Sequence, residues 1–144
     1  MTGGSPMATK PALTTEQVTA AMKAMLTKAN ETPEAPVAMA IVDAGGELLA
    51  YLTMDNLRIF SRRHALRKAY TSALMGRDSG EHAAGLHAQG RNIADLGDPR
   101  FTHGQGGLVI MQDGVILGGI GVGGYPSGQA DEDLSRVGLE AMAL

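Results

Sequence analysis

Apolar residues recur every three or four positions after Thr14, which predicts an amphipathic helix that ends before a proline-containing segment. Thr14 and Gln17 have the spacing of a capping box at the start of this helix. Two short apolar runs follow, over residues 37–43 and 48–54, with turn-forming glycines between them. This pattern predicts a β-hairpin. The apolar positions of the predicted helix are Val18, Ala21, Met22, Met25, Leu26 and Ala29.

The middle of the chain is predicted to form two helices. The first runs over about residues 62–75, with Ser61 as its N-cap and Gly76 at its C-terminal cap. The second is weaker, because it contains glycine, and runs from residue 78 or 79 to about residue 92.

A second hairpin and a last helix complete the chain. Leu108–Gln112 and Val115–Val122 are joined by Asp113-Gly114, a favoured two-residue hairpin turn. A glycine-containing loop leads to a helix from about Gln129. The predicted order is therefore α-β-β-α-α-β-β-α, which indicates an α+β fold with an antiparallel sheet flanked by helices. We expect a flexible tail over residues 1–12 and a single domain over residues 13–144.

The composition narrows the possible functions. The chain has 144 residues and no cysteine, which excludes disulfides, thiol nucleophiles and thiolate metal sites. Its net charge is −3 and its aromatic content is 3%, so the basic and stacking surfaces of nucleic-acid-binding proteins are missing. The N-terminus has no apolar signal segment, and Met7 could be an alternative start. We expect a cytoplasmic protein.

Glycine placement carries more information than the total of 20 glycines. Residues 119–124 fit the pattern G-x-G-x-x-G, but they lie within and just after a strand, and the next helix opens with three acids. A dinucleotide site needs the opposite arrangement, so we reject it. Strand glycines indicate a close approach to the backbone. Either a helix or subunit packs there, or a ligand does.

Two polar segments are candidates for chemistry. The helix over 62–75 carries a basic cluster, which is either a solvated face or an anion site. His103 lies in a flexible loop, either as a solvated residue or as a ligand or acid–base group. A surface metal site is a minor alternative. The basic cluster is Arg62, Arg63, His64, Arg67 and Lys68, and the metal candidates are Asp78, Glu81 and His82.

Several of these motifs resemble the GlcG/HbpS-like haem-binding family, which includes the C-terminal domains of PduO-type proteins. The resemblance implies a profilin-like layout, assembly into dimers or higher oligomers, and association with haem or a corrinoid. The first predicted helix has no histidine, so a haem ligand would be His64, His82, His87, His103, a methionine or a lysine. The motifs that carry the resemblance are Ala38–Asp43 with Gly45-Gly46, Thr53–Asn56, the Ala65-x-x-Lys68-Ala69-x-Thr71 core, Gly106–Ile110, Gly118–Gly124 and Asp131-Glu132.

The first hypothesis is a small-molecule-binding protein of this family. It would bind haem, a corrinoid or a small carboxylated metabolite at an oligomer interface, with Lys68 and Arg67 pairing with carboxylates. His64, His103 and Glu132 would add polar contacts. The glycines expected to allow close approach of the ligand are Gly106, Gly107, Gly121, Gly123 and Gly124.

Two other hypotheses stay open. The chain could be a cofactor-independent lyase or isomerase acting on a small organic acid or aromatic catabolite, with Lys68 or His103 as acid–base group and Glu132 as partner carboxylate. This assignment requires the three side chains to converge in one pocket. Alternatively, the chain could be a structural oligomer in which the glycines serve packing alone.

Overall fold

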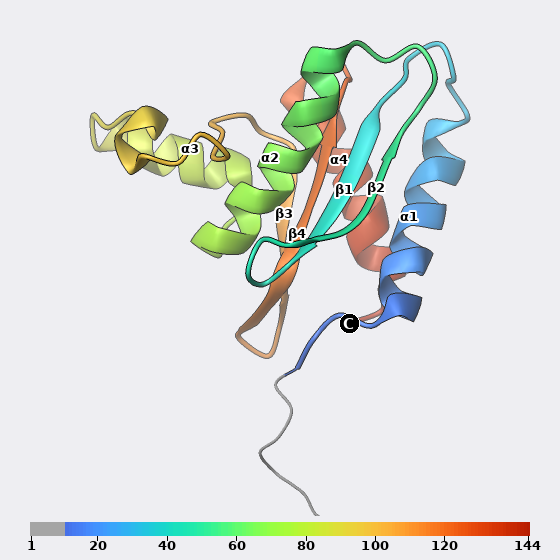
Figure 1. Cartoon of the computed structure of the whole chain (residues 1–144), viewed down its shortest axis with the longest axis horizontal. Coiled ribbons are helices and arrows are strands. Elements are labelled where there is room, and N and C mark those ends of the chain that lie inside the picture. The colour runs from blue at the N-terminus through green and yellow to red at the C-terminus, as the bar shows by residue number, and fades with distance from the viewer. Residues whose placement is uncertain (1–10) are drawn as a thin grey trace, which may run out of the picture.

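The computed structural model describes residues 11–144 (Figure 1). The expected tail over residues 1–12, including Met7, therefore falls almost wholly outside the described residues. The elements are α1 (Thr15–Ala29), β1 (Ala38–Asp43), β2 (Leu48–Thr53), α2 (Ile59–Met75), α3 (Ser79–Ala88), the 3-10 helix η1 (Ile93–Leu96), β3 (Gly107–Gln112), β4 (Val115–Gly123) and α4 (Gly128–Ala141).

The four strands form one antiparallel sheet in the order β2-β1-β4-β3. The two predicted hairpins are thus joined side by side through β1 and β4. Helix α2 lies across one face of the sheet, and α1 and α4 cover the other (Figure 1). The predicted α+β class and the sheet flanked by helices are confirmed.

The two faces of the sheet differ in the size of their side chains. Alternate residues of β1 point to opposite faces, so Met39 and Ile41 pack toward α1 and α4 while Ala38 and Ala40 pack toward α2. The core on the α1 and α4 side contains methionine, isoleucine and leucine, whereas the α2 side is largely alanine. Small residues on both surfaces allow α2 to lie very close to the sheet.

Glycines of β4 make this close approach possible. A Cβ atom at Gly119 would collide with the carbonyl oxygen of Ala69, and one at Gly121 with that of Ala65. At Gly123 it would lie 2.6 Å from the carbonyl oxygen of an earlier α2 residue. Two strand residues rise about 6.6 Å and four helix residues about 6 Å, so alternate glycines meet successive helical turns. Helix packing therefore accounts for these strand glycines.

Local sequence signals account for several helix and turn ends. The capping box of Thr14 and Gln17 is present, and Gly76 closes α2 in the left-handed conformation with φ 65°. Both turn residues of the second hairpin have positive φ, 52° at Asp113 and 78° at Gly114, as the predicted turn requires.

Two helix boundaries were predicted wrongly. Helix α2 begins at Ile59 with Arg58 as N-cap, and Ser61 lies inside the helix, where its hydroxyl accepts a hydrogen bond from Arg58 Nε at 3.2 Å. The next helix ends at Ala88 rather than near Asn92. The Asn92 side chain instead caps η1, because its short amide competes for nearby backbone donors.

The fold buries a histidine on α3, which has a consequence for stability. His82 is 8% exposed and its Nε2 has no hydrogen-bond partner among the described residues. Burial lowers the pKa of His82 from 6.5, with the charges of Arg77 and Arg91 acting in the same direction.

The unfolded chain therefore binds this proton more readily than the folded one, and stability is lost as the pH falls below 6.5. We expect His82→Gln to lose less unfolding free energy than the wild type between about pH 7.5 and about pH 5.5. Urea unfolding at the two pH values measures this, and an equal loss in both proteins would contradict it.

No helix among residues 11–144 combines the length and apolarity that a membrane crossing needs.

Candidate functional site

A cavity of about 240 Å³ opens between the first half of α2 and the loop that joins β4 to α4. Gly104 and Gln105, just before β3, form another side, and residues 123–128 form the loop side. We call it the Lys68 cavity. Its lining side chains from α2, its N-cap and α4 are Arg58, Phe60, Ser61, His64, Lys68 and Asp131.

A buried ion pair joins α2 to α4 at this cavity. Lys68 Nζ donates to Asp131 Oδ2 at 2.7 Å and to the carbonyl oxygen of Val122 at 3.0 Å. The two side chains are 8% and 5% exposed. The second carboxylate oxygen of Asp131 accepts from the backbone N–H of Tyr125 at 3.0 Å. This pair therefore fixes the start of α4 and the preceding loop against α2.

The ion pair also limits what Lys68 can do for a ligand. Burial raises the pKa of Asp131 above its usual range, against the opposing effect of the ammonium group of Lys68. An ammonium group has three donors, and two of them are used within the described residues. A ligand carboxylate would thus find one remaining N–H on a cation that Asp131 already balances.

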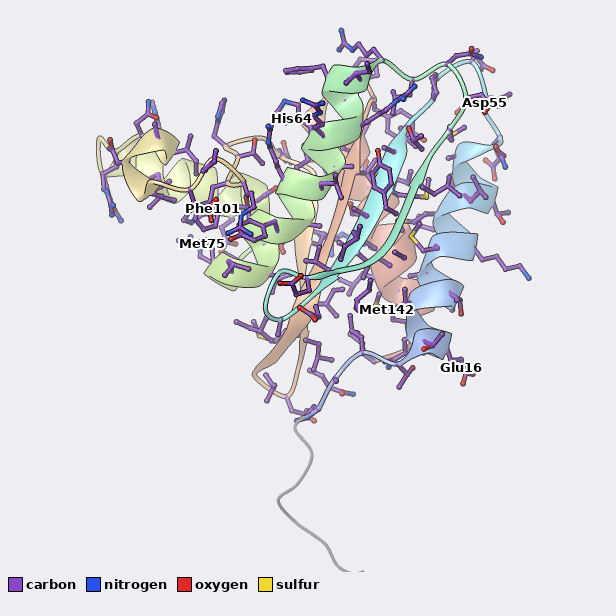
Figure 2. The ribbon with its side chains drawn as sticks, in the orientation of Figure 1. Glu16, Asp55, His64, Met75, Phe101 and Met142 are labelled. Atoms are coloured by element: carbon purple, nitrogen blue, oxygen red, sulfur yellow. The ribbon has the colours of Figure 1, made fainter. Side chains whose placement is uncertain are left out.

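His64 lies on α2 (Figure 2), and the sequence places it one turn before Lys68. Its Nδ1 is buried and has no hydrogen-bond partner among the described residues. Burial lowers the pKa of His64 from 6.5, and the positive charge of Lys68 lowers it further. The ring is therefore neutral at physiological pH, and a neutral imidazole offers one nitrogen lone pair to a ligand.

Two exposed apolar side chains begin α2 and are called the apolar rim, and one of them, Phe60, lines the cavity. Phe60 is 63% exposed and the adjacent Ile59 is 61% exposed. The Phe60 ring meets the His64 ring edge-on with centroids 4.3 Å apart, and the guanidinium carbon of Arg58 lies 5.9 Å from the Phe60 centroid. An aromatic face, a neutral imidazole and a cation thus occur together at one opening.

Residues 13–140 match the family described as "Haem degrading protein HbpS-like". The chain belongs to this HbpS-like family. The family named from sequence motifs is thereby confirmed.

Several individual proteins are similar to this chain. GlcG of Escherichia coli K12 is 34% identical over 86 residues, which are 60% of this chain and 63% of GlcG, so the match spans less than two thirds of that relative. A double mutant of Streptomyces reticuli HbpS has a TM-score of 0.83 and 31% identity, over 97% of this chain and 93% of that one. The crystal structure of a PduOC–haem complex has a TM-score of 0.81 at 24% identity, over 91% and 95% of the two chains, which shows the shared fold.

The acid that contacts Lys68 in this HbpS-like chain is Asp131, whereas the sequence analysis named Glu132 as the partner carboxylate of Lys68 or His103. One residue along a helix turns the side chain by about 100°. Glu132 therefore points elsewhere, where it accepts from Gln105 Nε2 at 3.4 Å and lies 3.9 Å from a guanidinium nitrogen of Arg136. Asp131 was missed, although it lies three residues before Leu134 on the buried stripe of α4.

The Lys68 cavity is not lined by the other predicted site side chains, although His103 is near enough to His64 for its charge to lower the pKa of His64. His103 is exposed and lines a different cavity of about 480 Å³ together with His87. Arg67 lines a third, on the other flank of α2. Lys68, His103 and Glu132 thus do not line one pocket, which was the condition set for the lyase or isomerase hypothesis.

Two of the five predicted ligand-binding glycines line the Lys68 cavity, and the other three lie against Lys68 or the α2 backbone. Gly123 and Gly124 line the Lys68 cavity. Gly106 covers the lysine instead, since a Cβ there would lie 2.9 Å from Lys68 Nζ. Gly107 and Gly121 face the α2 backbone, so helix atoms fill the space that a ligand would need beside them.

Two of the three candidate metal residues at the start of α3 are engaged in other contacts. Asp78 Oδ1 accepts from the backbone N–H of Val109 at 3.0 Å, and Glu81 pairs with Arg77 at 3.1 Å. Among residues 11–144, no three acidic or histidine side chains are grouped so as to hold a metal ion.

Proposed function

We propose that this HbpS-like chain binds haem at the Lys68 cavity and that a second copy of the chain completes the site. The observation that carries the proposal is the buried, unpartnered Nδ1 of His64, in a neutral ring beside an exposed aromatic side chain. The family description and the haem complex of the structurally similar PduOC support the choice of ligand.

The size of the cavity supports a shared site. Small-molecule sites enclose roughly 300–1,000 Å³, and haem is a large ligand, whereas this cavity has about 240 Å³. One chain would therefore enclose only part of the macrocycle. The exposed rim of Ile59 and Phe60 offers apolar surface that haem and a second copy would bury together.

Each residue at the opening has a role suited to its chemistry. His64 would hold the iron through its ring nitrogen, Phe60 would pack on the macrocycle, and Arg58 would pair with a propionate. The Lys68–Asp131 pair would keep the loop behind them in place. When bound, haem supplies the redox chemistry of its iron. A corrinoid has a similar flat macrocycle and would use the same side chains. A small carboxylated metabolite would contact only the positively charged side chains of the site.

Titration with haemin tests the proposal. We expect saturable binding with a shift of the Soret band in the wild type, and affinity weaker by at least about tenfold in His64→Ala, because the nitrogen ligand is lost. His87→Ala is the matched control, since it removes an exposed imidazole that lines another cavity, and it should bind as the wild type does. Light scattering should show haemin increasing the dimer population.

Two results would contradict the proposal. Equal haemin affinity in His64→Ala and the wild type would remove His64 from the site. Absence of saturable haemin binding would exclude haem, and saturable binding of a corrinoid or a small carboxylate by the same protein would then identify the alternative ligand.

A further inference from the structure

The cavity that Arg67 lines, of about 380 Å³, is a groove on the opposite flank of α2 from the Lys68 cavity. Arg63 and Arg67 border it, one helical turn apart, and they are joined by Arg100 from the loop before β3. We call it the arginine groove. Its apolar floor consists of Val42, Leu48, Leu66 and the ring of Tyr70.

One wall of the arginine groove is fixed by a hydrogen-bonded cluster. Arg100 donates to both carboxylate oxygens of Asp98 at 3.1 Å, and its guanidinium carbon lies 4.3 Å from the Tyr70 ring centroid. The Tyr70 hydroxyl donates to the same carboxylate at 2.6 Å. The hydrogen bonds from Arg100 and Tyr70 lower the pKa of Asp98 to about 2. Asp98 thus stays ionised, and its carboxylate accepts the hydrogen bonds that hold this wall together.

The guanidinium groups of Arg63 and Arg67 have no such carboxylate partner among residues 11–144. Like charges one turn apart on a helix repel each other. Glu47 is a nearby acid whose charge reaches Tyr70 and Arg100, and it is exposed. With three cations against Asp98 and Glu47, the groove keeps a net positive charge.

We propose that the arginine groove binds a small carboxylate with an aromatic body. The body would lie on the apolar floor, and the carboxylate would accept hydrogen bonds from Arg63 and Arg67, whose planar guanidinium groups match carboxylate geometry. The volume falls within the range of small-ligand sites, so one chain is sufficient. This site is separate from the proposed haem site because the two line opposite flanks of α2.

An NMR titration of the ¹⁵N-labelled protein with 2-naphthoate tests the inference. We expect saturable shifts of the backbone amides of Gly46, Leu48 and Arg63, which border or flank the groove. The neutral analogue 2-naphthamide should bind at least about fivefold more weakly, since it lacks the charge that the guanidinium groups recognise.

Variants separate the groove from general charge effects. Arg67→Gln should weaken 2-naphthoate binding by about fivefold or more, while Lys23→Gln should not, because Lys23 is an exposed cation on α1 across the sheet. Arg67 is only partly buried and makes no ion pair, so Arg67→Gln should fold, which its circular dichroism and urea midpoint confirm. His64→Ala should bind 2-naphthoate as the wild type does, which separates this test from the haemin titration.

Three outcomes would overturn the inference. One is equal binding of 2-naphthoate and 2-naphthamide, and another is a set of shifts confined to the Lys68 cavity. The third is that the wild type does not bind 2-naphthoate and forms an oligomer that dissociates in the Leu48→Glu variant. In that case a second copy of the chain, and not a small carboxylate, occupies the groove.

Discussion

Replacing Gly121 with alanine is expected to destabilise the protein by about 3 kcal/mol, the upper end of the usual cost of overpacking a core. The added Cβ would collide with the carbonyl oxygen of Ala65 and lie 2.6 Å from the backbone nitrogen of Ala69. Both obstacles are backbone atoms of α2, so the whole helix would have to move away from the sheet. Urea unfolding of the wild type and the variant measures the difference.

Gly45→Ala is the matched control for this substitution. A Cβ at Gly45 would lie 3.5 Å from Asp43 Oδ1, an ordinary contact, and its backbone is not in the left-handed region. This variant should be within about 0.5 kcal/mol of the wild type. If Gly121→Ala were as stable as Gly45→Ala, α2 would not be packed on β4 in the way described, and the positions of Lys68 and His64 would need revision.

Lys68→Met is expected to cost about 3–5 kcal/mol of unfolding free energy, because it leaves the buried carboxylate of Asp131 without its cation. The double variant Lys68→Met/Asp131→Asn should recover a large part of that loss. The asparagine carries no charge, and its amide oxygen can still accept from the backbone N–H of Tyr125. Urea unfolding of the wild type, both single variants and the double variant forms the complete cycle.

Additive losses in this cycle would contradict the account, because independent sites add while contacting groups couple. A suitable comparison is the exposed pair of Lys28 and Glu31, whose side chains are 57% and 62% exposed. Exposed ion pairs contribute little, so the same cycle at that pair should give a much smaller coupling.

Much of the fold could be predicted because its signals are local. The Thr14–Gln17 capping box and the Asp113-Gly114 turn each depend on residues a few positions apart, and the structure contains both. The helix boundaries that were predicted wrongly lie where neighbouring residues compete to cap the helix. Ser61 is a good capping residue, yet the chain enters α2 at Ile59, where the exposed apolar rim begins.

The site was predicted only in part because its contacts join distant segments. Lys68 could be found as a cation on a predicted helix, but Asp131 lies 63 residues further along the chain. Three consecutive acids open the last helix, and the sequence analysis chose Glu132, whereas Asp131 is the acid that contacts Lys68. The helical spacing of Asp131 to Leu134 and Gly138, which are both buried, was the signal that could have selected it.

The strand glycines show why a single pattern can have two explanations. The sequence indicated a close approach at residues 119–124 and left open whether a helix or a ligand made it. Gly119 and Gly121 meet α2, while Gly123 contacts α2 and also lines the Lys68 cavity together with Gly124. Packing explains the first two, and the end of the tract is where helix packing and the cavity meet.

The proposal that His64 receives haem at the Lys68 cavity is tested most directly by a crystal structure of the protein with haemin bound. We expect the iron within bonding distance of a His64 ring nitrogen, the macrocycle against Phe60, and its far side covered by a second copy of the chain. Haem bound instead between His87 and His103, or in the arginine groove, with His64 left free, would contradict the account.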